Sequence, residues 1–231
     1  MSERLDEVLG SCPLAGAPFS EQLSSHVCTE DGARVHGYAL EGDLAQHYGM
    51  AEVLLLSLTG ELPASQRARA AEVALIFSSG LSVAKAAGHA VITARVCGCD
   101  SAPLTGIAAL ALAEEAHALL GRCAELFVWL EAGEELSPPE CSCRPGGGVA
   151  RLLGDLEAEG IDLPTSFMAL HDEAALVAVL HWAGLTEPGQ ISAALVTSRL
   201  PNLLAEAESH VPRDFLAYPM NLPRFEYEPR K

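Results

Sequence analysis

The chain has 231 residues, enough for one large domain or two small ones, and its formal net charge is −17. Such an acidic chain repels nucleic acid and anionic membrane surfaces, which argues against either as a binding partner. The N-terminus lacks a basic region followed by an apolar run, and seven cysteines is an odd number. We therefore expect a cytoplasmic protein with reduced thiols.

The composition favours helices throughout. Ala and Leu dominate the chain, and both are strong helix formers. Aromatic residues make up only 5% of the sequence, and segments typical of strands are scarce. These features predict an all-α fold. Charged residues interrupt the apolar helices, so none is expected to span a membrane.

The most informative stretch, residues 37–63, reads GYALEGDLAQHYGMAEVLLLSLTGELP. After a Gly-Tyr turn and an acidic step, apolar residues follow in one long pattern. Gly60 can adopt the left-handed conformation that closes a helix, and Pro63 cannot continue one. The stretch therefore predicts a loop that leads into a buried helix with a firm end.

The other expected elements lie on either side of this stretch. Residues 1–36 predict an irregular lead-in, with a short helix and short extended pieces. Ser82 is expected to cap a helix, and breaks are expected at Gly121 and Pro201. Residues 133–148, GEELSPPECSCRPGGG, predict a linker. The expected helices lie within residues 2–9, 64–79, 82–96, 103–130 (two segments), 149–159, 171–184 and 186–210.

Two CxC pairs could in principle supply four thiolates to a zinc ion. They are Cys97 with Cys99 and Cys141 with Cys143. Their spacing differs from the CxxC that is usual in zinc sites. We expect free thiols here and no metal.

Residues 37–63 also resemble the N-terminal signature of the citrate synthase superfamily, through the pattern GY-x-L-E-x-DLA…AEVLLLSLTGELP. The similarity is greatest to the short citryl-CoA lyase-like members. The resemblance implies a helical large domain and a small mobile domain. Only about 50 residues separate Gly121 from His171, which is fewer than the superfamily uses for its small domain, so we expect most of that domain to be missing.

This resemblance gives four expected regions. Residues 1–36 form the lead-in and residues 37–121 form the first part of the large domain. Residues 122–170 form a remnant or linker in place of the small domain. Residues 171–231 form the C-terminal helices and arm.

The resemblance also implies a chemistry at the α-carbon of a coenzyme A thioester, which is a substrate and not a bound cofactor. In the superfamily an Asp moves the α-proton, one His stabilises the enolate oxygen, a second His polarises a ketone, and arginines bind carboxylates. The segment LALAEEAHALLGR stands where the first His and a glycine pair are expected, and His117 is its candidate. The turn expected to hold the second His keeps its glycines, in the run Pro-Gly-Gly-Gly at residues 145–148, but has no His.

The run Leu-His-Asp-Glu-Ala-Ala at residues 170–175 matches the segment that carries the base. The alignment places Glu173 on the base position, with Asp172 one residue away and His171 beside them as a substrate-binding candidate. The two carboxylates also have a structural interpretation. Asp172 is a good N-cap, and Glu173 in the first turn complements the helix dipole. Arg199 matches a substrate-carboxylate arginine, or alternatively pairs with a buried carboxylate such as Asp172 or Glu173.

Two functional hypotheses follow. The one we favour is a non-catalytic member of the superfamily, acting as a regulatory or scaffold subunit. The alternative is an active lyase or acyltransferase on a coenzyme A thioester or 2-oxo acid, with Glu173 as base and Arg199 as carboxylate anchor. In either case the resemblance implies a homodimer, or a heteromer with a full-length citrate synthase-like protein, and the Ala-rich helices over residues 64–97 suit such packing.

Overall fold

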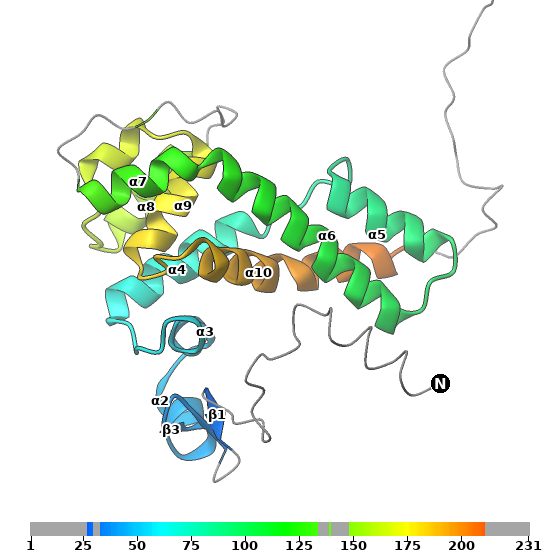
Figure 1. Ribbon diagram of the computed structural model, residues 1–231, viewed down its shortest axis with the longest axis horizontal. Helices are drawn as coiled ribbons and strands as arrows, with labels where there is room; N and C mark the ends of the chain where they lie inside the picture. The colour runs from blue at the N-terminus through cyan, green and yellow to red at the C-terminus, as the bar shows by residue number, and fades with distance from the viewer. Residues whose placement is uncertain (1–26, 30–32, 134–138, 140–147, 211–231) are drawn as a thin grey trace, which may run out of the picture.

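Helices make up almost all of the computed structural model, which describes residues 27–29, 33–133, 139 and 148–210 (Figure 1). The all-α fold class is therefore confirmed. The elements in chain order are β1 (Cys28–Thr29), β2 (Arg34–Val35), β3 (Tyr38–Ala39), the π-helical turn η1 (Leu40–Leu44), α2 (Ala45–His47), α3 (Met50–Thr59), α4 (Ser65–Ser78), α5 (Ala86–Val96), α6 (Ser101–Arg122), α7 (Ala124–Ala132), α8 (Gly148–Ala158), the 3-10 helix η2 (Thr165–Ala169), α9 (Asp172–Trp182) and α10 (Pro188–Glu208).

Short extended pieces expected before residue 37 are present as β1 and β2, and they form a small antiparallel sheet with β3, which follows residue 37. Its order is β1-β2-β3, with Cys28 opposite Val35 and Arg34 opposite Ala39. Val35, Leu44 and Leu56 are buried together beside it, which joins the sheet to α3. The sheet therefore packs through this cluster against α3, the helix that the sequence predicts to follow it.

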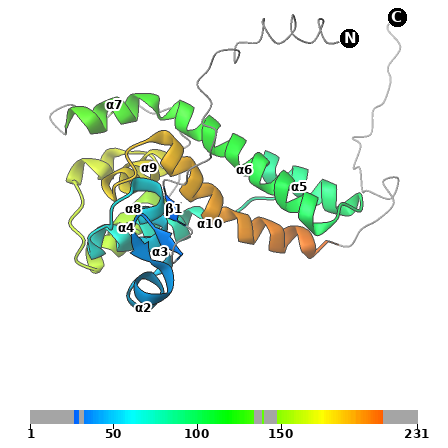
Figure 2. The same cartoon turned by 60° about the horizontal axis from the view of Figure 1, so that its bottom comes forward.

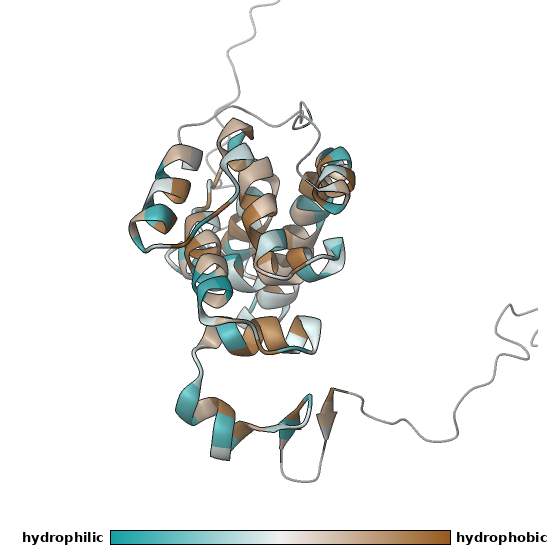
Figure 3. Ribbon diagram, turned by 90° about the vertical axis from the view of Figure 1, so that its left-hand side faces the viewer, coloured by the Kyte–Doolittle hydropathy of each residue, from teal (hydrophilic) through white to brown (hydrophobic). Residues whose placement is uncertain are grey.

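Two long helices, α6 and α10, run beside one another and connect two apolar cores (Figures 1 and 2). One core lies where α5 packs against both of them, and it includes the buried residues Val91, Leu104 and Leu203. The other core surrounds α9 and takes in α4, α7 and α8. In the side view, hydrophobic residues run through these stacked helices (Figure 3). Every residue of α9 from Ala174 to Leu180 is buried, so α9 is the centre of this second core.

The firm end of α3 is confirmed. Gly60 has φ +83° and its backbone N–H donates to the Leu56 carbonyl oxygen at 2.8 Å. This left-handed closure is the one that a glycine allows at no steric cost. Pro63 follows in the connection to α4, whose observed bounds agree with the expected helix over residues 64–79.

Three expected helix boundaries are wrong. The two helical segments expected over residues 103–130 are present as α6 and α7, but the break falls at Cys123 and not at Gly121, because Leu119 and Leu120 keep the last turn of α6 in the core. Helix α10 continues through Pro201. Proline there removes one backbone donor, and burial of the flanking turns at Leu195 and Leu203 outweighs that loss.

The third boundary concerns α5. Ser82 does not cap the helix: residues 82–85 form a turn in which the Lys85 N–H donates to the Ser82 carbonyl oxygen at 3.0 Å, and α5 begins at Ala86. Of the expected linker, residues 134–138 and 140–147 lie outside the described residues, and so do Cys141, Cys143 and the helix expected over residues 2–9. The helix expected over residues 149–159 is present as α8.

Helix α6 is long and apolar enough to cross a membrane by length and composition, which differs from the expectation that charges interrupt every apolar helix. A helix in the centre of a helical bundle passes the same test. Helix α6 packs against both α5 and α10 and buries Leu104, Ala108 and Leu112 between them. Its apolar composition is accounted for in part by this packing.

Gly88 lets the turn before α5 cross that helix closely. A Cβ atom at Gly88 would lie 2.7 Å from the Ser82 carbonyl oxygen and 2.9 Å from the Val83 Cα. Both are backbone atoms and cannot move aside alone. The glycine therefore fixes the path of the turn, and with it the position of Lys85 at the start of α5.

We predict that Gly88→Ala lowers the free energy of unfolding by about 1–3 kcal/mol, because the added methyl group overpacks this crossing. The matched control is Gly106→Ala on α6, where an added Cβ has no atom within 4 Å. There the loss of backbone freedom in the unfolded chain should raise stability by about 0.5–1 kcal/mol. Urea unfolding midpoints measure both changes. A Gly88→Ala protein as stable as the control would contradict the close crossing.

Candidate functional site

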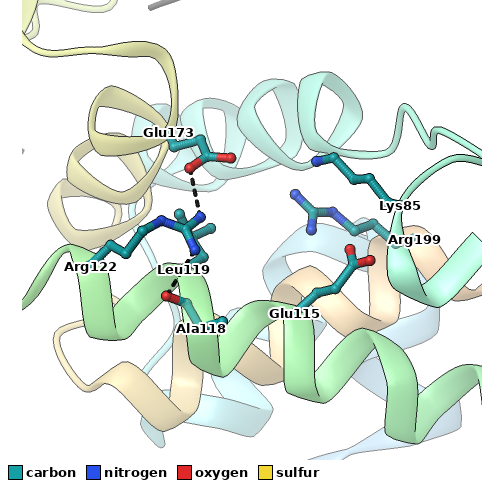
Figure 4. Close-up of a pocket in the computed structure, with 7 residues that line it drawn as sticks. All are labelled: Lys85, Glu115, Ala118, Leu119, Arg122, Glu173 and Arg199. Carbon is teal, nitrogen blue, oxygen red and sulfur yellow. Dashed lines mark hydrogen bonds and ion pairs between the residues drawn. The ribbon is translucent and has the colours of Figure 1, made fainter. Parts of the chain in front are cut away.

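A cavity of about 520 Å³ opens where the start of α5 meets α6, α9 and α10. On α6, Glu115, Ala118 and Arg122 are spaced three and four residues apart, which puts them on one face of the helix. The side chains that line the cavity come from α6, α9 and α10 and from the N-cap of α5, and they converge on one space (Figure 4). They are Lys85, Glu115, Ala118, Leu119, Arg122, Glu173 and Arg199.

Arg199 comes from α10 and is partly buried. Its Nε donates to the Ser78 carbonyl oxygen at 2.8 Å, at the last residue of α4. Its two terminal nitrogens make no hydrogen bond to any other residue that the structure describes, and they point into the cavity (Figure 4). Burial lowers the pKa of the guanidinium, and the nearby charges of Glu115 and Glu173 act in the opposite direction.

Lys85 lies at the N-cap of α5. Its ammonium group is on the same side of the cavity as the Arg199 guanidinium, and both point into the same space (Figure 4). No described carboxylate lies within ion-pair distance of the Lys85 ammonium. Two cationic groups with unfilled hydrogen-bonding capacity therefore face one space.

Glu115, on the neighbouring helix α6, caps the N-terminus of α5. Its Oε1 accepts a hydrogen bond from the Ala87 backbone N–H at 2.8 Å. Lys85, the N-cap residue of α5, offers no side-chain cap of its own. A carboxylate at a helix N-terminus satisfies a free donor and complements the helix dipole. Glu115 is thus held in a structural role at the edge of the cavity.

Arg122 and Glu173 form an ion pair on the opposite side of the cavity. Arg122 Nη2 lies 2.9 Å from Glu173 Oε2, and Arg122 Nη1 donates to the Ala118 carbonyl oxygen at 3.2 Å (Figure 4). The two side chains are 43% and 34% exposed. The pair links the last turn of α6 to the first turn of α9.

Of the residues singled out in the sequence, the structure brings Glu173 and Arg199 into one cavity. His117 is exposed and lies off the cavity-lining face of α6, and His171 is exposed and not among the lining residues. Asp172 does not line the cavity either. Two of the five candidates named from the sequence therefore line the same cavity.

The expected structural partners differ in detail. The N-cap of α9 is His171, so the prediction of Asp172 as that cap is wrong. Asp172 instead accepts a hydrogen bond from the Gly148 N–H at 3.2 Å, at the start of α8. Arg199 donates a hydrogen bond to the backbone carbonyl of Ser78 and not to a carboxylate. Glu173 lies in the first turn of α9, as expected, and it pairs with Arg122.

Lys85, Glu115 and Arg122 were not found from the sequence. Glu115 and Arg122 fall seven residues apart on one helix, a spacing that places them on the same face. This seven-residue spacing indicates a shared face only if one continuous helix includes both residues, as α6 does. For Lys85 there was no local signal, because its position depends on the turn that crosses Gly88.

The cavity carries three cationic side chains and two carboxylates, a local charge of +1 in a chain of net charge −17. An isolated cationic site in an acidic protein favours a small anion. A guanidinium fork with free terminal nitrogens is suited to a carboxylate or phosphate. No group of three His, Cys, Asp or Glu residues that could hold a metal occurs in the described ranges.

No family model matches the sequence, and no curated protein matches it. Among solved structures, citryl-CoA lyase from Hydrogenobacter thermophilus has the same fold, with a TM-score of 0.60 and 17% sequence identity. The match covers 91% of this chain and 97% of the lyase chain. The chain therefore has a citrate synthase-like, all-α fold. Because the match extends over nearly the whole lyase chain, it does not confirm that most of a small domain is missing.

We predict that Glu115→Ala lowers the free energy of unfolding by about 1 kcal/mol, because it leaves the Ala87 N–H without its partner. Glu115→Gln keeps an acceptor oxygen and should lose less. Glu114→Ala, on the exposed side of the same helix, is the control and should change stability by no more than about 0.5 kcal/mol. Urea unfolding measures all three, and equal stability of the Glu115→Ala and Glu114→Ala proteins would contradict the capping role.

Proposed function

We propose that this protein is a degenerate citryl-CoA lyase-like subunit that binds a small polycarboxylate and does not catalyse a reaction. The observation that carries the proposal is Arg199, whose terminal nitrogens point into the cavity without a hydrogen bond to another described residue. A partly buried guanidinium in this state gains from an anion that restores the solvation lost on burial. Lys85 adds a second positive charge on the same side.

The lining of the cavity supports a non-catalytic role. Among the described residues that line it there is no histidine, so no imidazole is available there to stabilise a developing enolate oxygen. The candidate His117 lies off the lining face of α6. The carboxylate of Glu173 is engaged by Arg122 at 2.9 Å.

A regulatory or scaffold role implies a partner subunit, either a second copy or a full-length citrate synthase-like protein. Apolar side chains exposed on α6 support such an association: Leu110 is 66% exposed and Ile107 is 36% exposed. The cytoplasmic location stays a prediction.

The alternative is an active carbon–carbon lyase or acyltransferase on a coenzyme A thioester. It is favoured by one observation, that Glu173 and Arg199 line the same cavity. In this function Glu173 acts as the base and Arg199 as the carboxylate anchor, which is the pairing of roles that the superfamily resemblance implies.

We predict that the protein binds citrate and that Arg199→Gln weakens this binding at least about tenfold, because charge-assisted hydrogen bonds contribute about 1.5–3 kcal/mol. The matched control is Arg151→Gln, which removes the same charge from an exposed position on α8. Isothermal titration calorimetry measures the affinities, and unfolding curves recorded in parallel confirm that each variant is folded. Equal citrate affinity in the two variants would contradict the proposed anchor.

We further predict that the wild-type protein does not turn over citryl-CoA. The assay follows loss of the thioester, with citryl-CoA lyase as the positive control. Turnover that Glu173→Gln abolishes while Arg151→Gln preserves it would replace the proposed function by the active-enzyme alternative.

A further inference from the structure

The Arg122–Glu173 ion pair lies within the lining of the cavity. Both side chains are partly exposed, at 43% and 34%, and they meet across 2.9 Å. An ion pair that is open to solvent contributes little, at most about 1 kcal/mol. A ligand anion can therefore replace Glu173 in its contact with Arg122 Nη2 at a small cost.

The other carboxylate of the cavity is not exchangeable in this way. Glu115 accepts from the Ala87 backbone N–H, which has a fixed position in the first turn of α5. Its displacement would leave that donor unsatisfied. Glu173, in contrast, accepts from the end of the long Arg122 side chain. That side chain can turn toward either Glu173 or a ligand anion.

The cations of the cavity form two groups. Arg199 and Lys85 lie on one side, and Arg122 lies on the other with Glu173 (Figure 4). Ala118 and Leu119 line the cavity as well and provide no charge. A volume of about 520 Å³ is within the range of small-molecule pockets.

We propose that Glu173 is a specificity-determining residue that acts as an internal anion. It competes with the ligand for Arg122, so the cavity selects ligands that carry two separated anionic groups. One group binds at Arg199 and Lys85, and the second displaces Glu173 from Arg122. This inference rests on the proposed function, since it assumes that the cavity binds a carboxylate.

The test is calorimetry with three probes: citrate, which has separated carboxylates, and acetate and inorganic phosphate, which are compact anions. Glu173→Gln should raise citrate affinity about fivefold, because the competing ion pair is worth up to about 1 kcal/mol. Acetate and phosphate should gain about twofold or less, from the change in charge alone. Glu114→Gln removes the same charge from the exposed side of α6 and should leave all three affinities unchanged.

The double variant isolates the mechanism. In an Arg122→Gln background the selective gain for citrate from Glu173→Gln should disappear, because there is no longer a cation for which to compete. Persistence of the gain in that background, or an unchanged or weaker citrate affinity in Glu173→Gln alone, would overturn the inference. If wild-type citrate binding is still lost in Arg199→Gln, the proposed function survives that result. If neither the wild-type protein nor Glu173→Gln binds citrate, both are overturned, and binding by Glu173→Gln alone supports the competition.

Discussion

The guanidinium of Arg199 is the constraint on which the rest of the site depends. A partly buried positive charge must find compensation inside the protein, since burial removes its hydration. The Ser78 carbonyl oxygen supplies one hydrogen bond. It belongs to the last turn of α4, where backbone carbonyls have no partner within the helix and carry the negative end of the helix dipole. Arg199 and the end of α4 therefore satisfy one another.

The same contact also joins the two cores. Asn202, one turn further along α10, donates to the Ser79 carbonyl oxygen at 3.2 Å, so α10 closes the end of α4 through two residues. Asn202 follows Pro201 in the chain, so it reaches the Ser79 carbonyl oxygen because α10 continues through that proline. Its far end packs with α5 and α6, and this arrangement brings Lys85 and Glu115 to the side of Arg199.

Much of the fold could be predicted from the sequence, because composition and apolar periodicity act locally. The all-α class and the end of α3 at Gly60 depend on neighbouring residues alone. The continuation of α10 through Pro201 was missed, since burial on both sides of the proline overrides its local preference. In the site, Glu173 and Arg199 were found from a resemblance. Lys85 and Glu115 were missed because their roles arise from contacts between elements, such as the bond from Ala87 to Glu115.

A crystal structure of the protein with citrate tests the central claim most directly. We expect a citrate carboxylate within about 2.7–2.9 Å of the terminal nitrogens of Arg199, the range of charge-assisted hydrogen bonds. We also expect that the Glu173 carboxylate no longer contacts Arg122. Citrate bound elsewhere, or bound in the cavity without contact to Arg199, would contradict the role of Arg199 as the anion anchor.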